Sequence, residues 1–489
     1  MNRSDLEMYL LLTSRTSSCS DFLRSLNCVV NNKSIHSKLK YSIIDRIYID
    51  MFFNYNAKIF FLLLTVVLVS PTIIVRETIT SVSALSPSIS HTYLTSSSPQ
   101  NNIPNNLTST FKITGEIKHR INALLDSNRT NAAIVIGIVD PNGTQFYSNG
   151  KMSKANNSTV NENTIFAIGS NTKIFTTILL ADMVQEGLVK LNDPVDKYLP
   201  SNVKVPQYNG HKITIENLAT HTSGLPEFPP NYCPGVAKAK PQSSDEQVKL
   251  MSCTKNYTFD RFYQGLSNTT IPREPGLKLE YSTFGSALLG NILTLKSNMS
   301  SYDELVAKRI LNVLGMNSTS INLSDEQKSR LAIGHLLGRE LPLLNLSNPM
   351  VPGGGLYSSA GDMLKFISAN IGLIKTKLDN AMEESHLIRH STGQLIPNNI
   401  RVSGNTGNNT ILEFYVGLGW FITTNLGNEI IWHNGATGGG YNAFMAFNPT
   451  AHRGIVVLCS SDRSDVDIST LGLNQKGKIS SLIWNLLSQ

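Results

Sequence analysis

The stretch FAIGSNTKIFTTILLADMVQEGL, residues 166–188, decides how the rest of the chain is interpreted. A strand-like run, TIFAIG, leads into a helix predicted over residues 170–187, which is apolar on most faces and is therefore expected to be buried. Ser170 and Lys173 are three residues apart at the start of this helix, so their side chains share one face. The N–H groups and dipole of a helix start favour negative charge, and a desolvated lysine can accept a serine proton. The stretch therefore predicts an activated serine.

The segments on either side of this stretch predict an α+β fold. A helix over residues 112–127 precedes AAIVIGIVD (132–140) and TQFYSN (144–149), which form a hairpin across the turn PNG. A mainly helical block then extends to about residue 385, and from residue 411 short strands return in FYVGLGWFITT, NEIIWHNG, YNAFMAFNP and RGIVVLCSS, before a last helix in KISSLIWNLL. The simplest packing joins early and late strands into one antiparallel sheet flanked by terminal helices. The helical block is then an inserted lobe, with a cleft between the two parts.

Two other segments carry reactive side chains, although no segment is specific alone. S-x-x-K occurs six times in the chain, so only its context distinguishes the copy at Ser170. In REPGLKLEYSTFGSALLGNIL (273–293), Tyr281 leads into an apolar helix. A tyrosine beside a lysine can shuttle a proton, but a lone tyrosine is more often a core residue. In EIIWHNGATGGGYNAFMAFNP (429–449), a strand ends at His433 before a glycine-rich turn, where a strand edge can approach a ligand.

Taken together, these motifs resemble the active-site-serine β-lactamase-related family. S-x-x-K is followed by Y-x-x about 110 residues later and by H-x-G about 150 residues after that. The family includes class C-like β-lactamases, D-Ala-D-Ala carboxypeptidases, D-aminopeptidases and some esterases. The resemblance covers about residues 112–489 and extends to GLVKLNDPVDKYLP (187–200), NLATHTSGLP (217–226), EPGLKLEYS (274–282) and PGGGLYSSAGDMLKF (352–366). It implies the β-lactamase/transpeptidase-like fold, in agreement with the layout above.

The resemblance also implies roles for individual residues. Ser170 would be the nucleophile, Lys173 its proton acceptor or hydrogen-bond organiser, and Tyr281 the relay to and from the leaving group. Whether Lys173 or Tyr281 is the base in acylation stays open. His433 would face the cleft as a cation of adjustable charge, so that activity would depend on pH near 6–7.

The oxyanion and substrate-binding positions include two departures from the family pattern. The oxyanion hole would be formed by the N–H groups of Ser170 and Ala436, with Gly435 allowing close approach. Thr283 stands where the family usually has an Asn that holds a substrate carbonyl, and His433 stands where many members have the Lys of K-T-G. Both changes favour a D-peptide hydrolase or an esterase over efficient hydrolysis of β-lactams.

An apolar segment near the N-terminus predicts export. Residues 59–75 are largely apolar and follow Lys58, so residues 59–84 are interpreted as a signal peptide or membrane anchor. Residues 1–58 would be a cytoplasmic or untranslated extension, 85–111 a Ser/Thr/Asn/Pro-rich linker, and 112–489 the hydrolase domain. Lysine and arginine crowd the N-terminal side of the apolar segment, which places the bulk of the chain outside the membrane. Several N-x-S/T sequons, such as those at Asn106 and Asn256, agree with export.

Charge, cysteines and missing motifs exclude other classes of function. The formal charge of +7 over 489 residues includes no basic cluster, so no nucleic-acid partner is expected. The sequence contains no H-E-x-x-H, G-x-S-x-G or P-loop motif, and we expect neither a metal nor a cofactor. A Cys233–Cys253 disulfide is expected if that loop is extracellular. A small-molecule or peptide substrate remains the expected partner. The alternative to catalysis is an inactive exported binding protein that keeps the fold.

Overall fold

The computed structural model describes residues 111–127, 132–233, 243–344, 346, 348–397, 411–425, 428–461 and 487. The chain divides into two compact units, residues 1–102 and 103–489, and all the described elements belong to the second. Our predictions for residues 1–58, for the export segment 59–84 and for the linker before residue 111 lie outside the described residues. The same holds for the last predicted helix, except for Leu487. None of the helices in the described part has the length and apolar character needed to cross a bilayer.

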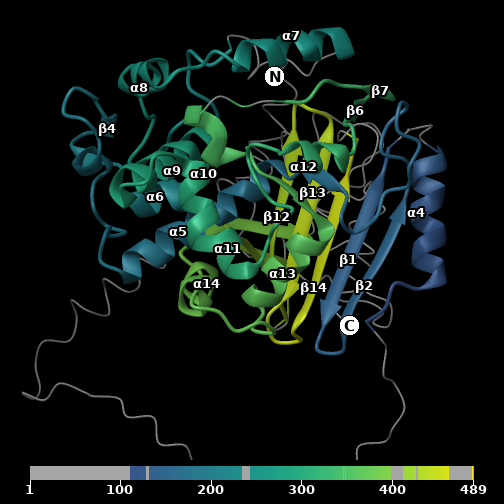
Figure 1. Ribbon diagram of the computed structural model, residues 1–489. Helices are drawn as coiled ribbons and strands as arrows, with labels where there is room; N and C mark the ends of the chain where they lie inside the picture. The colour runs from purple at the N-terminus through teal and green to yellow at the C-terminus, as the bar shows by residue number, and fades with distance from the viewer. Residues whose placement is uncertain are drawn as a thin grey trace, which may run out of the picture. The chain divides into compact units, whose positions relative to one another are not determined.

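The largest sheet among the described residues is antiparallel and has eight strands (Figure 1). Its strands are β1 (Ile134–Asp140), β2 (Gly143–Asn149), β9 (His390–Pro397), β10 (Ile411–Val416), β11 (Phe421–Asn425), β12 (Asn428–Thr437), β13 (Tyr441–Asn448) and β14 (Arg453–Cys459). They lie in the order β2-β1-β14-β13-β12-β11-β10-β9. The first strand therefore pairs with the last, with Ile134 opposite Cys459. This confirms the prediction that early and late strands share one sheet.

Both faces of the sheet are covered. In β1 the side chains alternate, so Ile134, Ile136 and Ile138 join one apolar cluster while Val135 and Val139 join another. Helix α4 (Gly115–Ser127) packs on the first face, as the predicted N-terminal helix should. The helical block packs against the second face, and Figure 1 shows the two helical layers on opposite sides of the sheet.

The predicted inserted lobe lies between β2 and β9. Its longer helices are α5 (Thr172–Gln185), α7 (Ser244–Thr254), α8 (Phe259–Ser267), α9 (Thr283–Ser297), α13 (Ala360–Asn370) and α14 (Asp379–His386). Shorter turns are η1 (Gly169–Asn171), η2 (Val195–Tyr198), α6 (Ile215–Ala219), α10 (Tyr302–Val306), η3 (Ala307–Leu311), α11 (Asn312–Leu314), α12 (Asp325–Ser329) and η4 (Asn348–Gly353). Two-stranded pairs are formed by β3 (Ile165–Ala167) with β8 (Tyr357–Ser359), β4 (Gln207–Tyr208) with β5 (His211–Lys212), and β6 (His335–Leu336) with β7 (Arg339–Glu340).

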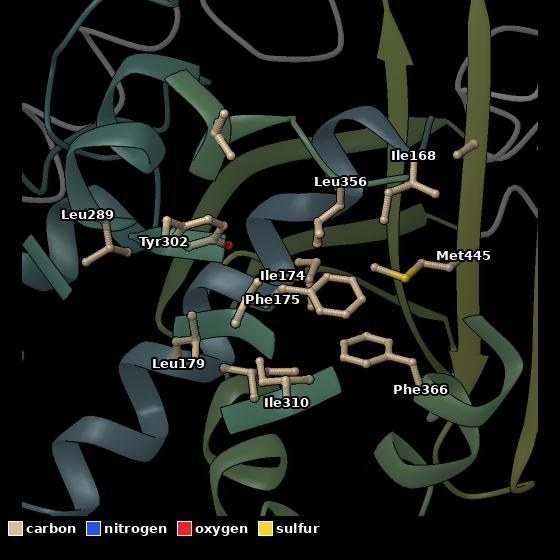
Figure 2. Packing of buried hydrophobic residues seen from close by; sticks show 14 of the residues in the cluster. Ile168, Ile174, Phe175, Leu179, Leu289, Tyr302, Ile310, Leu356, Phe366 and Met445 are labelled. Carbon is tan, nitrogen blue, oxygen red and sulfur yellow. The ribbon is translucent and has the colours of Figure 1, made fainter. Parts of the chain in front are cut away.

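Helix α5 is the centre of the core. Because its sequence is apolar on nearly every side, it is buried along most of its length, as predicted. Figure 2 shows Ile174, Phe175 and Leu179 of this helix among side chains from several other elements. The ring of Phe175 stacks on that of Phe366 from α13, with 4.3 Å between the centroids. This packing holds the N-terminal end of α5 in a fixed position beside the sheet.

Three of the five cysteines lie among the described residues, and the expected disulfide is present. Cys233 and Cys253 form a disulfide, which ties the end of α7 to the segment that follows Tyr232. Cys459, at the end of β14, is a buried thiol in the core.

Candidate active site

Ser170 lies in η1, the single turn that precedes α5. Gly169 has a φ of 51°, which L-residues with side chains rarely adopt, and a Cβ there would lie 3.0 Å from the Ala436 nitrogen. Glycine at this position therefore allows η1 to pack against β12. The Thr172 hydroxyl donates to the Gly169 carbonyl over 2.7 Å and accepts from the Leu356 N–H over 3.1 Å, which fixes the turn. The Ser170 side chain remains partly exposed at the surface of a cleft.

Lys173 lies directly behind Ser170, as the helical spacing predicts. Its Nζ donates to Ser170 Oγ over 2.9 Å and to the Gly353 carbonyl over 2.5 Å. The lysine side chain is only 1% exposed, and its burial away from water lowers the pKa from 10.5 to about 7. The negative charge of Glu227 opposes part of this fall. A substantial fraction of Lys173 is therefore neutral near pH 7 and able to accept a proton from the serine.

Tyr281 lies next to this pair, at the start of α9. Lys173 Nζ is 4.9 Å from the centroid of the Tyr281 ring. The Tyr281 ring also packs on His221, with 4.6 Å between the ring centroids. The His221 Nδ1 accepts from the Ser282 N–H over 3.2 Å, so the buried imidazole supports the segment that carries the tyrosine. His221 therefore has a structural role, because it is buried and bonded to the backbone beside Tyr281.

His433 occupies the cluster but not in the predicted manner. It is fully buried, does not line the cleft, and stacks on Phe421 with 5.2 Å between the ring centroids. Burial, together with the nearby Lys173, lowers the pKa of His433 to about 3. The prediction of an adjustable cation facing the cleft is therefore wrong. The imidazole is neutral at physiological pH, with its centroid 6.4 Å from that of Tyr281.

The strand edge beside Ser170 is formed by Gly435 and Ala436. The pairing of β11 with β12 ends at Trp432, whereas the pairing of β12 with β13 continues to Thr437. The turn that carries Ser170 occupies the edge of β12 beyond Trp432. A Cβ on Gly435 would overlap the Ile168 carbonyl oxygen and lie 3.0 Å from the Ser170 nitrogen, so this close approach needs glycine. These close approaches bring the backbone nitrogens of Ser170 and Ala436 near each other at the edge of β12.

These groups border a cleft of about 750 Å³. Its wall is mostly apolar, and Thr283, which was predicted to bind substrate, is one of the residues that line it. The apolar and aromatic lining residues are Phe228, Tyr232, Leu250, Met251, Leu279, Tyr281, Leu344, Leu346, Phe414, Phe421, Trp432 and Ala436. The polar and glycine lining residues are Ser170, Glu227, Gln247, Thr254, Thr283, Gly353, Gly354, Asn434, Thr437 and Gly438. We call this set of residues the cleft.

The comparison with protein families identifies the chain. The profile of the family described as Beta-lactamase matches residues 119–474, which is most of the sequence. The chain belongs to the beta-lactamase family. The predicted family is thus confirmed, and so is the predicted class of enzyme, a β-lactamase-related serine hydrolase.

Two curated proteins illustrate how this member of the beta-lactamase family relates to others. It is similar to the D-alanyl-D-alanine-carboxypeptidase/endopeptidase AmpH of Escherichia coli (strain K12), with 29% identity over 334 residues, which are 68% of this chain and 80% of that protein. It is also similar to Protein flp of Staphylococcus aureus (strain N315), with 27% identity over 304 residues, which are 61% of this chain and 53% of that protein.

Solved structures confirm the predicted β-lactamase/transpeptidase-like α+β fold. A beta-lactamase/D-alanine carboxypeptidase from Yersinia pestis superposes with a TM-score of 0.55 and 24% identity, covering 75% of this chain and 94% of that one. A class C beta-lactamase in complex with cefoxitin gives a TM-score of 0.59 and 20% identity, covering 76% and 97%. At these identities, the similarity to the solved structures shows the fold and nothing further.

Some residues of this beta-lactamase-family site were not found from the sequence. The Gly353 carbonyl holds Lys173, although the sequence indicated only that PGGGLYSSAGDMLKF is a family segment. Glu227 follows directly after the HTSGLP turn, and Asn434 stands within the H-N-G motif; both line the cleft. Within the described ranges, no group of three or more His, Cys, Asp or Glu residues is placed to hold a metal ion.

Proposed function

We propose that this chain is an exported serine hydrolase in which Ser170 attacks the carbonyl of an amide or ester. Neutral Lys173 takes the proton of the serine hydroxyl as the bond from Oγ to carbon forms. The N–H groups of Ser170 and Ala436 stabilise the oxyanion. When the carbon–nitrogen or carbon–oxygen bond breaks, the proton passes from Lys173 through the Tyr281 hydroxyl to the leaving group. Water then releases the acyl group from the serine.

One observation carries this proposal. The Nζ of Lys173 is 2.9 Å from Ser170 Oγ, and its pKa is lowered to about 7 by burial. An efficient base needs a pKa near the working pH and a position within hydrogen-bond reach, and this lysine has both. A member of the fold that served only as a binding protein would have no need to keep a buried amine against a partly exposed serine.

The proposed substrates are amides of D-amino-acid peptides. The name of the Escherichia coli relative, a D-alanyl-D-alanine-carboxypeptidase/endopeptidase, supports this class. A carboxylesterase activity is the second candidate, because the wall of the cleft is mostly apolar and would accept uncharged esters.

The proposal includes export and the domain boundaries. The hydrolase domain is placed at residues 112–489, behind a signal peptide or anchor at 59–84 that would attach the chain to the membrane through residues 59–75. The Cys233–Cys253 disulfide supports export, because such bonds persist mainly in oxidising compartments.

The test is a panel of p-nitrophenyl esters, D-amino-acid amides and a β-lactam, assayed with the wild type and with Ser170→Ala. We expect Ser170→Ala to lose at least about 10³-fold in kcat, because nucleophile and base act as a unit. Ser158→Ala is a matched control, since this serine is exposed and lies outside the cleft. Turnover that survives in Ser170→Ala would refute the proposal, as would the absence of turnover on every substrate in the panel.

A further inference from the structure

Charge is distributed unevenly around the cleft. Among the described residues that line it, Glu227 is the one carboxylate, and none is a lysine or an arginine. Lys173 is buried behind the surface, and the neutral His433 is not exposed at all. An adjoining cavity is also lined by Lys328, and it shares four lining residues with the cleft, Leu344, Leu346, Gly354 and Thr437. That lysine is paired with Asp325 over 3.0 Å.

Glu227 is held at the cleft by its backbone. Its carbonyl accepts from the Phe284 N–H over 2.9 Å, and the carbonyl of Pro226 accepts from the Ser282 hydroxyl over 2.7 Å. These bonds fix Glu227 beside the start of α9, where Tyr281 and Thr283 also line the cleft. The backbone is therefore anchored, while the residue is exposed, so that its side chain can meet a ligand.

The carboxylate of Glu227 already acts on the reaction centre. Its charge raises the pKa of Lys173, against the larger lowering that burial causes. A carboxylate on the acyl part of a bound substrate would meet Glu227 with the same sign, and none of the described lining residues is a lysine or an arginine. A protonated amine would meet an opposite charge, and an apolar side chain beside it would meet the wall formed by residues such as Tyr232 and Met251.

We propose that Glu227 gives the cleft its charge selectivity on the acyl side of the scissile bond, favouring substrates that carry a protonated amine beside an apolar group there and disfavouring those that carry a free carboxylate there. This inference rests on the proposed function of Ser170. It assigns a substrate-selecting role to Glu227 within the same site. A carboxylate holds an amine by charge-assisted hydrogen bonds, which are stronger than neutral ones.

The test compares three substrates with one reporter group. D-Phenylalanine p-nitroanilide carries the amine, its N-acetyl derivative is neutral, and its N-succinyl derivative carries a carboxylate. Assays are done at about pH 7, below the usual pKa of an α-amino group. We expect kcat/KM to fall in the order amine, acetyl, succinyl. In Glu227→Gln we expect the ratio of kcat/KM for the amine to that for the acetyl substrate to drop at least about fivefold, mainly through KM.

The control is Glu246→Gln. Glu246 is an exposed residue of α7, the helix that forms part of the cleft wall, but it does not line the cleft. The same charge is therefore removed nearby, and the substrate order should not change. The pH profile gives a second readout, because loss of Glu227 removes a charge that raises the Lys173 pKa. The acid limb of the pH profile of kcat/KM should therefore move to lower pH in Glu227→Gln. The other titratable groups that face Lys173, namely His221, His433 and Tyr281, are unchanged in this variant.

The outcomes separate this inference from the proposed function. A fluorophosphonate probe has neither the amine nor the carboxylate and reports on Ser170 alone. If the probe labels Ser170 but the amine and succinyl substrates react equally, or if both variants change the ratio alike, the role of Glu227 is refuted and the hydrolase proposal stands. If the probe does not depend on Ser170, the proposed function itself fails.

Discussion

Replacing Lys173 by Met should stabilise the folded protein at neutral pH while it removes activity. The lysine is buried, and desolvation lowers its pKa from 10.5 to about 7. That difference corresponds to about 5 kcal/mol that the folded state loses by holding the amine away from water. Methionine has a similar length, needs no hydration and fits a buried site. The two hydrogen bonds to Ser170 and Gly353 would be lost, at a cost of roughly 1–3 kcal/mol, so the expected net gain is about 2–4 kcal/mol.

The sign of the pH dependence follows from the direction of the shift. Below pH 7 both the folded and the unfolded chain bind the lysine proton, so the full penalty is present. Between about pH 7 and 10.5 only the unfolded chain keeps the proton, and the stability of the wild type rises with pH by up to about 1.4 kcal/mol per unit. The advantage of Lys173→Met should therefore shrink as the pH is raised through this window.

The assay is denaturant unfolding of the wild type and Lys173→Met at pH 7 and pH 9, with fluorophosphonate labelling as the readout of activity. In the wild type the labelling rate should fall about tenfold per pH unit below the Lys173 pKa. Lys365→Met is a matched control, because this lysine is 44% exposed and paired with Asp362, so its loss should bring no gain. A Lys173→Met variant that is less stable at pH 7, or whose advantage is the same at both pH values, would refute the reasoning.

Two more predictions concern the oxyanion site and the disulfide. Gly435→Ala places a Cβ against the Ile168 carbonyl, so the Ser170 and Ala436 nitrogens should separate and kcat should fall about 10²–10³-fold. The control is Gly115→Ala, because a Cβ at Gly115 meets no atom within 4 Å. Equal kcat values in the two variants would contradict the role of Gly435 in forming the oxyanion site. Replacing both Cys233 and Cys253 by Ser removes a disulfide between residues 20 positions apart, so the free energy of unfolding measured with denaturant should fall by about 3 kcal/mol. An unchanged free energy of unfolding would show that the disulfide does not constrain the fold.

The parts of the site set by local periodicity could be predicted from the sequence. Ser170 and Lys173 share a helix face because of their spacing, and the strand pattern of residues 132–149 and 411–461 indicated one antiparallel sheet. Tyr281 and Ala436 were found through the motifs around them. For Ser170, Lys173 and the strands the signal lies within a few neighbouring residues, whereas for Tyr281 and Ala436 it lies in the order and spacing of the motifs along the chain.

The environment of His433 could not be predicted in the same way. Alternation along β12 directs Trp432, Asn434 and Ala436 to the cleft and His433 away from it, but the sequence does not say which set faces the ligand. The burial of the imidazole depends on Phe421 from the neighbouring strand and on Tyr281 from α9. The contact of the Gly353 carbonyl with Lys173 likewise joins residues 180 positions apart and depends on tertiary packing.

The most direct measurement is the site of covalent modification by a fluorophosphonate, mapped by peptide mass spectrometry after trypsin digestion. We predict an adduct on Ser170, within the tryptic peptide that spans residues 155–173, formed more slowly as the pH falls below 7. An adduct on any other residue, or the same adduct rate at pH 5 and pH 8, would contradict a serine activated by a buried, neutral lysine.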